Sequence, residues 1–310
     1  MMTDRAFTRT SRCWTGSLAM LLLLTGAFFT ASAVADEPQA DKPAEKAASK
    51  EKKIVLVAGT PSHGRGDHEF NAGVQLLKGC LDRTPGIHCD MHLNGWPKDP
   101  KAFDGADAIM LYMDGGGGHP LIRDNHLAQI KALMDRGVGL VCVHYAVEVP
   151  REKGGPELLD WIGGYYETGF STNPHWVGDF KVLPEHVITR GVKPFAIRDE
   201  WYYSIRFRPE MKGITPILKA TPPDNSRGTP AAKEHPGREE IVAWAVERPD
   251  GGRGFGFTGG HNHINWGDAY FRKLVLNALV WAAHGEIPAD GIVSDVQADD
   301  LKKNLDPKKR

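Results

Sequence analysis

The chain has 310 residues, with 38 Lys and Arg against 39 Asp and Glu, 35 Gly and 21 Pro. This composition excludes a fibrous or wholly disordered chain, and the length suffices for one large domain or two small ones with a full hydrophobic core. A formal net charge of -1, with no Lys/Arg run interleaved with aromatic residues, argues against nucleic acid as a partner.

The first 35 residues predict a secretory signal peptide. Basic residues precede an apolar stretch over residues 18–29, and the small side chains of Ala33-Val34-Ala35 follow as a cleavage site. The alternative is an uncleaved membrane anchor, which usually needs about 20 apolar residues and is therefore disfavoured. The mature protein is expected to be secreted or periplasmic, without stable insertion in a membrane.

We predict that the mature chain begins at Asp36 and lies beyond the inner membrane. The reason is that the small residues at 33 and 35 suit a signal peptidase, which cleaves after them. N-terminal sequencing of the purified protein is the measurement that checks this. An intact Met1 on cytoplasmic protein would contradict it.

Strands and helices alternate in the first half of the predicted fold. Residues 36–53 predict a disordered linker, because they have almost no large apolar side chain to bury. The apolar run at 54–58 that follows is typical of a strand buried on both faces. Further strands are predicted at 87–93, 108–112 and 138–143, and amphipathic helices at 69–81 and 125–135. This alternation indicates parallel βαβ units.

After Pro150 the chain changes to short segments punctuated by Gly and Pro. Strands are predicted at 178–183, 213–219, 241–246 and 254–258, and a last helix at 270–284. The pattern predicts one α/β domain over 54–287 of flavodoxin-like or class I glutamine amidotransferase-like type, with a mostly parallel sheet and helices on both faces. Residues 288–310 are expected to form a charged, extended tail.

The cysteines and the glycine run argue against a disulfide framework and against nucleotide binding. The mature chain would retain Cys80, Cys89 and Cys142, which have neither metal-binding spacing nor an even count, so a disulfide framework is not expected, although a Cys80–Cys89 bridge stays open. The four glycines at 115–118 lack the offsets of a dinucleotide fingerprint or a P-loop. No nucleotide cofactor is therefore predicted, and a turn that lets the backbone approach a ligand is the better interpretation.

Histidine-rich loops follow the predicted strands, and ligands of open α/β sheets bind beyond the carboxyl ends of the strands. His144 is the sharpest of these positions, since it directly follows the strand at 138–143. Cys142 lies two residues inside that strand, where apolar burial makes a thiol a poor nucleophile. An imidazole at the turn can serve as acid, base or metal ligand but does not form the thioester needed to hydrolyse glutamine. A structural histidine that donates to a backbone carbonyl is the alternative.

These motifs together resemble the ThuA-like (trehalose utilisation) proteins, which are related in fold to the class I glutamine amidotransferases. The matching stretches within 54–287 are Ser62-His63, Asp67-His68, Val143-His144, His175-Trp176-Val177-Gly178, Asp199-Glu200-Trp201-Tyr202, Gly260-His261 and Trp281-Ala282. The resemblance implies an amidotransferase-like fold without the nucleophilic cysteine. It also implies a role with sugars, in particular oxidised (keto) sugars and their glycosides, and it favours Glu200 together with Tyr202 as pocket residues.

We predict a carbohydrate-processing enzyme of the hydrolase, lyase or isomerase type, in which His144 and Glu200 transfer protons. Substrate contacts are predicted for His68, Trp176, Asp199, Tyr202 and His263. A divalent metal, with Zn favoured, would draw its ligands from His63, His144, His175, Glu200 and His261, because neutral imidazoles suit late first-row ions. In an extended segment His261 and His263 would face the same way, which suits a Zn-type pair, and an ordinary polar loop is the alternative.

Three alternatives stay open. The histidines can form a metal-free, hydrogen-bonded cluster that binds sugar hydroxyls directly, and the whole domain can be a non-catalytic carbohydrate-binding module. Large aromatic residues such as Trp176 can equally belong to the core.

Overall fold

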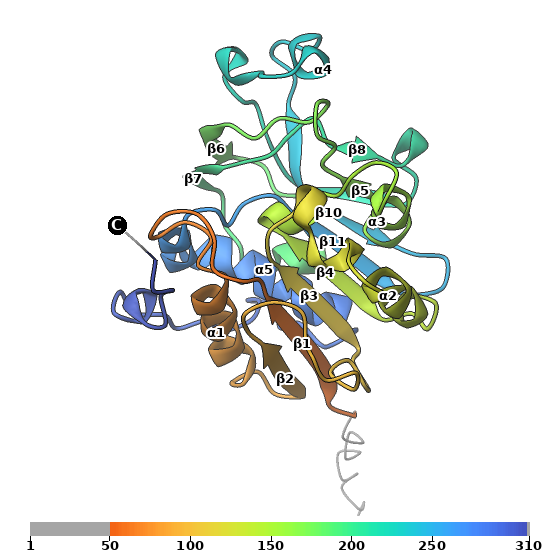
Figure 1. Ribbon diagram of the computed structural model, residues 1–310. Coiled ribbons are helices and arrows are strands. Elements are labelled where there is room, and N and C mark those ends of the chain that lie inside the picture. The colour runs from red at the N-terminus through yellow and green to blue at the C-terminus, as the bar shows by residue number, and fades with distance from the viewer. Residues whose placement is uncertain (1–49, 309–310) are drawn as a thin grey trace, which may run out of the picture. The chain divides into compact units, whose positions relative to one another are not determined.

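A seven-stranded sheet forms the centre of the molecule, in the order β2-β1-β3-β4-β11-β10-β9 (Figure 1). The computed structural model describes residues 50–308, so the predicted signal peptide and most of the predicted linker lie outside the described residues. The strands from β2 to β11 in this order run parallel, and β10 is antiparallel to both of its neighbours. The bounds are β1 Lys52–Ala58, β2 Ile87–His92, β3 Ala108–Tyr112, β4 Gly139–Val143, β9 Ile214–Ala220, β10 Glu240–Glu247 and β11 Arg253–Phe257.

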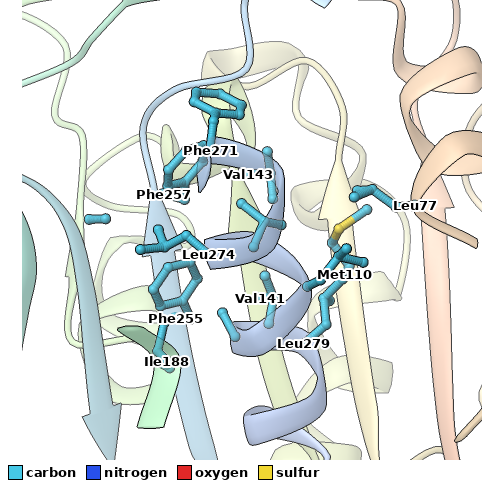
Figure 2. Packing of buried hydrophobic residues seen from close by; sticks show 14 of the residues in the cluster. Leu77, Met110, Val141, Val143, Ile188, Phe255, Phe257, Phe271, Leu274 and Leu279 are labelled. Carbon is cyan, nitrogen blue, oxygen red and sulfur yellow. The ribbon is translucent and has the colours of Figure 1, made fainter. Parts of the chain in front are cut away.

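Helices cover both faces of this sheet. The helices are α1 Phe70–Leu81, α2 His126–Met134, α3 Gly155–Trp161, the short α4 Pro230–Lys233 and α5 Ala269–Ala282. Alternate residues of a strand point to opposite faces, so Val141 and Val143 of β4 pack in the same apolar layer as α1 and α5, whereas Leu140 and Cys142 pack with α2 and α3. Figure 2 shows α5 lying over β4 and β11, with Leu274 between them. Burial on both faces explains the unbroken apolar runs of the parallel strands.

Two small sheets lie in the long segment between β4 and β10. They are β5 Gly164–Tyr165 with β8 Arg206–Phe207, and the hairpin of β6 His175–Phe180 with β7 Phe195–Glu200. In the hairpin His175 is opposite Glu200, and Trp176 is opposite Asp199. The pairs therefore lie on opposite faces of the hairpin, and only one face can point toward a common site.

The fold class predicted from the sequence is confirmed, with corrections at three places. Lys52 and Lys53, predicted to end the linker, begin β1, and the strand predicted at 178–183 begins three residues earlier, at His175. The segment after 287 is not an extended tail outside the domain. Its apolar residues Ile292 and Leu301 are buried in the layer of α1 and α5, and their wide spacing among charged residues is why no apolar pattern was visible.

Two further observations concern residues 50–308. Cys80, Cys89 and Cys142 are all buried and free, so the bridge left open between the first two is not formed. No helix in this range is long and apolar enough to cross a membrane.

Candidate functional site

Polar side chains from five segments meet at the carboxyl edge of the sheet. β2 and β3 lie on either side of β1, and ligands bind to open α/β sheets at such a change of direction in the strand order. The loop after β1 carries His63 and His68, the loop after β3 carries Asp114, His144 directly follows β4, β11 is followed by His261, and the β6–β7 hairpin contributes His175 and Glu200.

Three imidazoles, those of His68, His144 and His261, face one another and form what we call the three-histidine cluster. The Nε2 of His68 is 3.0 Å from Nδ1 of His261 and 3.1 Å from Nε2 of His144, and the remaining distance, between His144 Nε2 and His261 Nδ1, is 3.3 Å. Glu200 Oε2 lies 3.0 Å from His261 Nδ1 and 3.5 Å from His144 Nε2. One ligand atom from each of these four residues lies within 4.8 Å of all the others.

The outer hydrogen bonds of the rings determine which nitrogen carries the proton. His68 Nδ1 donates to Asp114 Oδ1 at 3.0 Å, and His144 Nδ1 donates to the carbonyl of Thr258 at 2.9 Å. In the neutral rings the Nε2 atoms then carry lone pairs, and these two lone pairs point at each other. A proton on His261 Nδ1 can be donated to only one acceptor at a time. A cation between the three rings would satisfy all of the lone pairs together.

The spacing of these nitrogens suits a shared metal ion. Nitrogen ligands about 2.0–2.1 Å from a tetrahedral Zn ion lie about 3.3–3.4 Å from each other. Metal-binding histidines also need an outer partner that orients the ring. Asp114 and the Thr258 carbonyl are such partners for two rings, and Asp67 Oδ1 lies 3.6 Å from the outer nitrogen of His261. The donor set therefore fits a divalent late first-row metal.

Burial and charge set the protonation of the cluster. Burial lowers the pKa of His68 and lowers that of His144 well below its ordinary value, so both rings are neutral at neutral pH. Burial also acts to lower the pKa of His261, but the hydrogen-bonded Glu200 carboxylate, with Asp67 and Asp199, outweighs it and the pKa is raised. Of the three rings, His261 is thus the one whose protonated form the surroundings favour.

Three histidines of this site have a strained backbone. His63, His68 and His144 have φ angles of 59°, 47° and 56°, in the left-handed region that residues other than glycine rarely adopt. Such strain costs about 1–3 kcal/mol per residue and persists where the surrounding structure enforces it. The sharp turn expected after the strand at 138–143 is present, and it brings the ring of His144 into the cluster.

Asp199 holds the loop that carries His261. Its carboxylate is fully buried and accepts the backbone N–H groups of Gly260 at 2.7 Å and His261 at 3.1 Å. Gly260 has a φ of 112°, which a side chain would disfavour. Asp199 therefore positions His261 and does not line a pocket, which differs from its predicted contact with substrate.

Two predicted site residues lie outside the cluster. Trp176 is buried in the core, and its indole donates to the carbonyl of Trp201, because the alternation along β6 turns it away from the face that carries His175. Of the two interpretations of His261 and His263, an extended pair or an ordinary polar loop, the structure has the loop. The segment is not extended there, since a 3₁₀ turn begins at His263, whose buried ring packs elsewhere.

The other predicted residues lie around the cluster. The ring of His63 lies against that of His68, tilted by 37° with centroids 3.7 Å apart, and the ring of His175 meets His261 edge-on at 4.9 Å. The Tyr202 hydroxyl is 3.3 Å from His144 Nε2, and burial raises the pKa of that phenol well above its ordinary value. His68, predicted to contact substrate, lies between His144 and His261 in the cluster.

The roles of two residues were missed in the sequence. Asp114 orients His68, and Asn173 Nδ2 donates to Glu200 Oε1 at 3.1 Å, which fixes the carboxylate. The place of Asp114 directly after a buried strand was a usable signal. Asn173 lies in an irregular segment without any periodic pattern, so nothing in the sequence marked it.

Most of the chain matches one known protein family. The family model described as ThuA, trehalose utilisation, matches residues 53–282, which is more than half of the chain. The chain belongs to the ThuA family. The match includes every member of the three-histidine cluster and Glu200, but it ends before the C-terminal segment that packs on α1 and α5.

Solved structures agree with this assignment. A ThuA-like protein from Bacteroides uniformis aligns with a TM-score of 0.55 and 16% identity, over 78% of this chain and 95% of that chain. A ThuA-like protein from Parabacteroides merdae gives 0.54 and 18%, over 81% and 99%. At these identities the likeness establishes the ThuA-like fold alone. No curated protein sequence matches the chain significantly.

Proposed function

We propose that this ThuA-family protein is an exported enzyme that binds a divalent metal on the three-histidine cluster and transfers protons on an oxidised (keto) sugar or glycoside. The observation that carries the proposal is the convergence of three ring nitrogens, within 3.0–3.3 Å of one another, two of them fixed as lone-pair acceptors. A site of three neutral nitrogens beside one carboxylate favours Zn or a neighbouring late first-row ion over Ca or Mg.

The proposed division of roles follows from burial. His144 is fully buried and both of its ring nitrogens are engaged, so we assign it to metal binding in place of the proton transfer predicted from the sequence. Glu200 keeps the proton-transfer role. Its side chain is 14% exposed, Asn173 fixes one oxygen, and the other oxygen faces the cluster. Three protein ligands and one open position are typical of catalytic metal sites.

A keto sugar suits this arrangement chemically. A divalent ion held by the three imidazoles would polarise a carbonyl oxygen and so acidify the hydrogen on the carbon next to that carbonyl. Glu200 Oε2 is 3.5 Å from His144 Nε2 and would accept that proton, and the Tyr202 hydroxyl, 3.3 Å from the same nitrogen, is a donor at the same position. Proton transfer of this kind is the first step of an isomerase or a lyase acting on a keto glycoside.

Metal content is the direct test. Elemental analysis of protein purified without a His tag is expected to find about one equivalent of metal per chain. His144→Ala should lose that metal, with an affinity reduced by more than about 100-fold, because even outer partners of ligands are worth about 10- to 100-fold. A metal-free wild-type protein that remains active after chelation would contradict the proposal, and would favour the hydrogen-bonded cluster.

Cys142→Ala provides the matched control from the same strand. The thiol is fully buried two residues before His144, and burial raises its pKa, so it is neither a nucleophile nor a ligand. The substitution should cost about 1–2 kcal/mol of unfolding free energy through the lost side chain, and leave metal content unchanged. Loss of metal in this variant would mean that packing around β4, and not the His144 ligand, controls binding.

Hydrogen exchange on a bound keto glycoside distinguishes an enzyme from a non-catalytic binding module. The wild-type protein, incubated with keto glycosides in D₂O, should exchange the hydrogen next to the carbonyl, which NMR detects whatever the later step is. Binding of the sugar with no exchange and no turnover would support the non-catalytic module.

A further inference from the structure

Residues after position 282, where the family match ends, hydrogen-bond to the loop that carries His68. Glu69, next to His68, is a fully buried carboxylate. Its Oε1 accepts the backbone N–H of Gly66 at 2.9 Å, and its Oε2 accepts the backbone N–H of Asp306 at 2.7 Å. Asp306 is itself held by Asn71 Nδ2, at 2.7 Å from its Oδ1. The C-terminal segment thus binds the first turn of α1 and the loop before it.

Lys308 completes these contacts. Its ammonium group donates to the carbonyl of Asp67, donates to the carbonyl of His68 at 3.1 Å, and lies 3.5 Å from Glu69 Oε1. The side chain is only 5% exposed, so the charge is removed from water and its acceptors replace the lost hydration. Figure 1 shows the C-terminal end of the chain beside the loop that follows β1.

These contacts act where the backbone is strained. His68 has a φ of 47°, and its N–H donates to the carbonyl of His261 at 2.9 Å. The Lys308 ammonium binds the carbonyls of Asp67 and His68, the two that flank the Cα of His68, at the same time. A left-handed residue of this kind returns to an ordinary conformation unless its neighbours enforce it. Rotation of the backbone there would turn the ring of His68 away from the other two imidazoles.

We propose that Lys308 is a positioning residue for His68, and that the C-terminal segment 299–308 is a working part of the metal site. The proposal rests on the metal function proposed above. It assigns to Lys308 no contact with substrate or metal. Its effect is to keep the loop at 64–69 in the conformation that presents His68 Nε2 to the cluster.

The test compares Lys308→Met with Lys302→Met in the full chain. Lys302 lies in the same segment, but its side chain is 74% exposed and it pairs with Asp299 at the surface. In Lys308→Met, hydrogen exchange of the amides at 64–69 should be at least about 10-fold faster while amides of β1 and β4 keep their rates, and Zn²⁺ affinity should fall about 10- to 100-fold. Lys302→Met should change neither quantity.

The outcomes are separable. Unchanged loop exchange, or faster exchange with unchanged Zn²⁺ affinity, would overturn the positioning role. If the wild-type protein binds no Zn²⁺, the proposed metal function fails while the positioning of His68 is decided by whether exchange of its own amide quickens. Should Lys308→Met fail to fold, Glu69→Gln tests the same contact from the other side, because it removes the carboxylate charge but keeps an acceptor. The same loop loosening is expected, and its absence would refute the proposal.

Discussion

Glu200→Gln is expected to retain its metal and to slow proton transfer about 10²- to 10⁴-fold, the usual contribution of a general acid or base. The amide keeps the shape of the side chain and can still accept from Asn173, but it cannot take a proton. The measurement is exchange of the hydrogen next to the carbonyl of a keto glycoside in D₂O, together with metal content. No other single substitution is expected to separate binding from chemistry so widely.

Glu185→Gln is the control for this variant, because it makes the same change of charge at an exposed position between β6 and β7. It should behave as wild type in both measurements. If Glu200→Gln also loses the metal, Glu200 is a fourth ligand and another group accepts the proton. If exchange continues at the wild-type rate, the carboxylate has no part in the reaction.

Acid is expected to destabilise the protein through His119, which lies outside the three-histidine cluster. The ring is fully buried, accepts the N–H of Leu121 and donates to the carbonyl of Ala146 at 3.1 Å. Burial lowers its pKa from 6.5 to about 4. The folded state therefore takes up fewer protons than the unfolded state. The associated stability is complete above about pH 6.5 and is lost as the pH falls to about 4, by about 3 kcal/mol in total.

Urea unfolding in the presence of a chelator checks this, with His119→Asn as the comparison. Asparagine keeps an acceptor for the Leu121 N–H but does not titrate. Between about pH 7 and about pH 4.5, wild type should lose about 2 kcal/mol more unfolding free energy than the variant. Equal losses in the two proteins would show that the pKa of His119 is the same in the folded and unfolded states, which would contradict the prediction.

The parallel strands were predictable because strands buried on both faces are continuous apolar runs in the sequence. β3 was predicted residue for residue, and the edges of β1 and β4 were within two residues, since each is an apolar run bounded by polar loops. The gathering of histidines at one edge followed from parallel topology alone. Both results depend on rules that apply to whole strands and need no knowledge of loop conformation.

Which side chains meet in the three-histidine cluster depended on loop conformation, which the sequence does not specify. His63 and His68 belong to one loop and both have positive φ, yet one ring is in the cluster and the other lies outside it. In the hairpin the residues that can face the cluster depend on register, which placed His175 there and Trp176 in the core. For His263, a 3₁₀ turn replaced the extended segment on which the prediction depended.

The C-terminal segment escaped prediction for a different reason. Its contacts are made by single residues, Leu301 against Gly267 and Lys308 against the loop after β1, which have no periodicity. A lysine near the end of a charged stretch normally indicates a solvated side chain. The partners that bury the Lys308 side chain, the Glu69 carboxylate and the carbonyls of Asp67 and His68, lie in a distant part of the sequence.

The β6–β7 hairpin has a consequence for how sites of this kind can diversify. The three imidazoles come from loops attached to the central sheet, whereas Glu200 comes from a hairpin that pairs only within itself among the described strands. The hairpin also carries Asp199, which accepts the backbone N–H groups of Gly260 and His261 and so holds one of the three imidazoles. Related sequences can therefore vary the carboxylate at position 200 freely only while they keep the carboxylate at position 199.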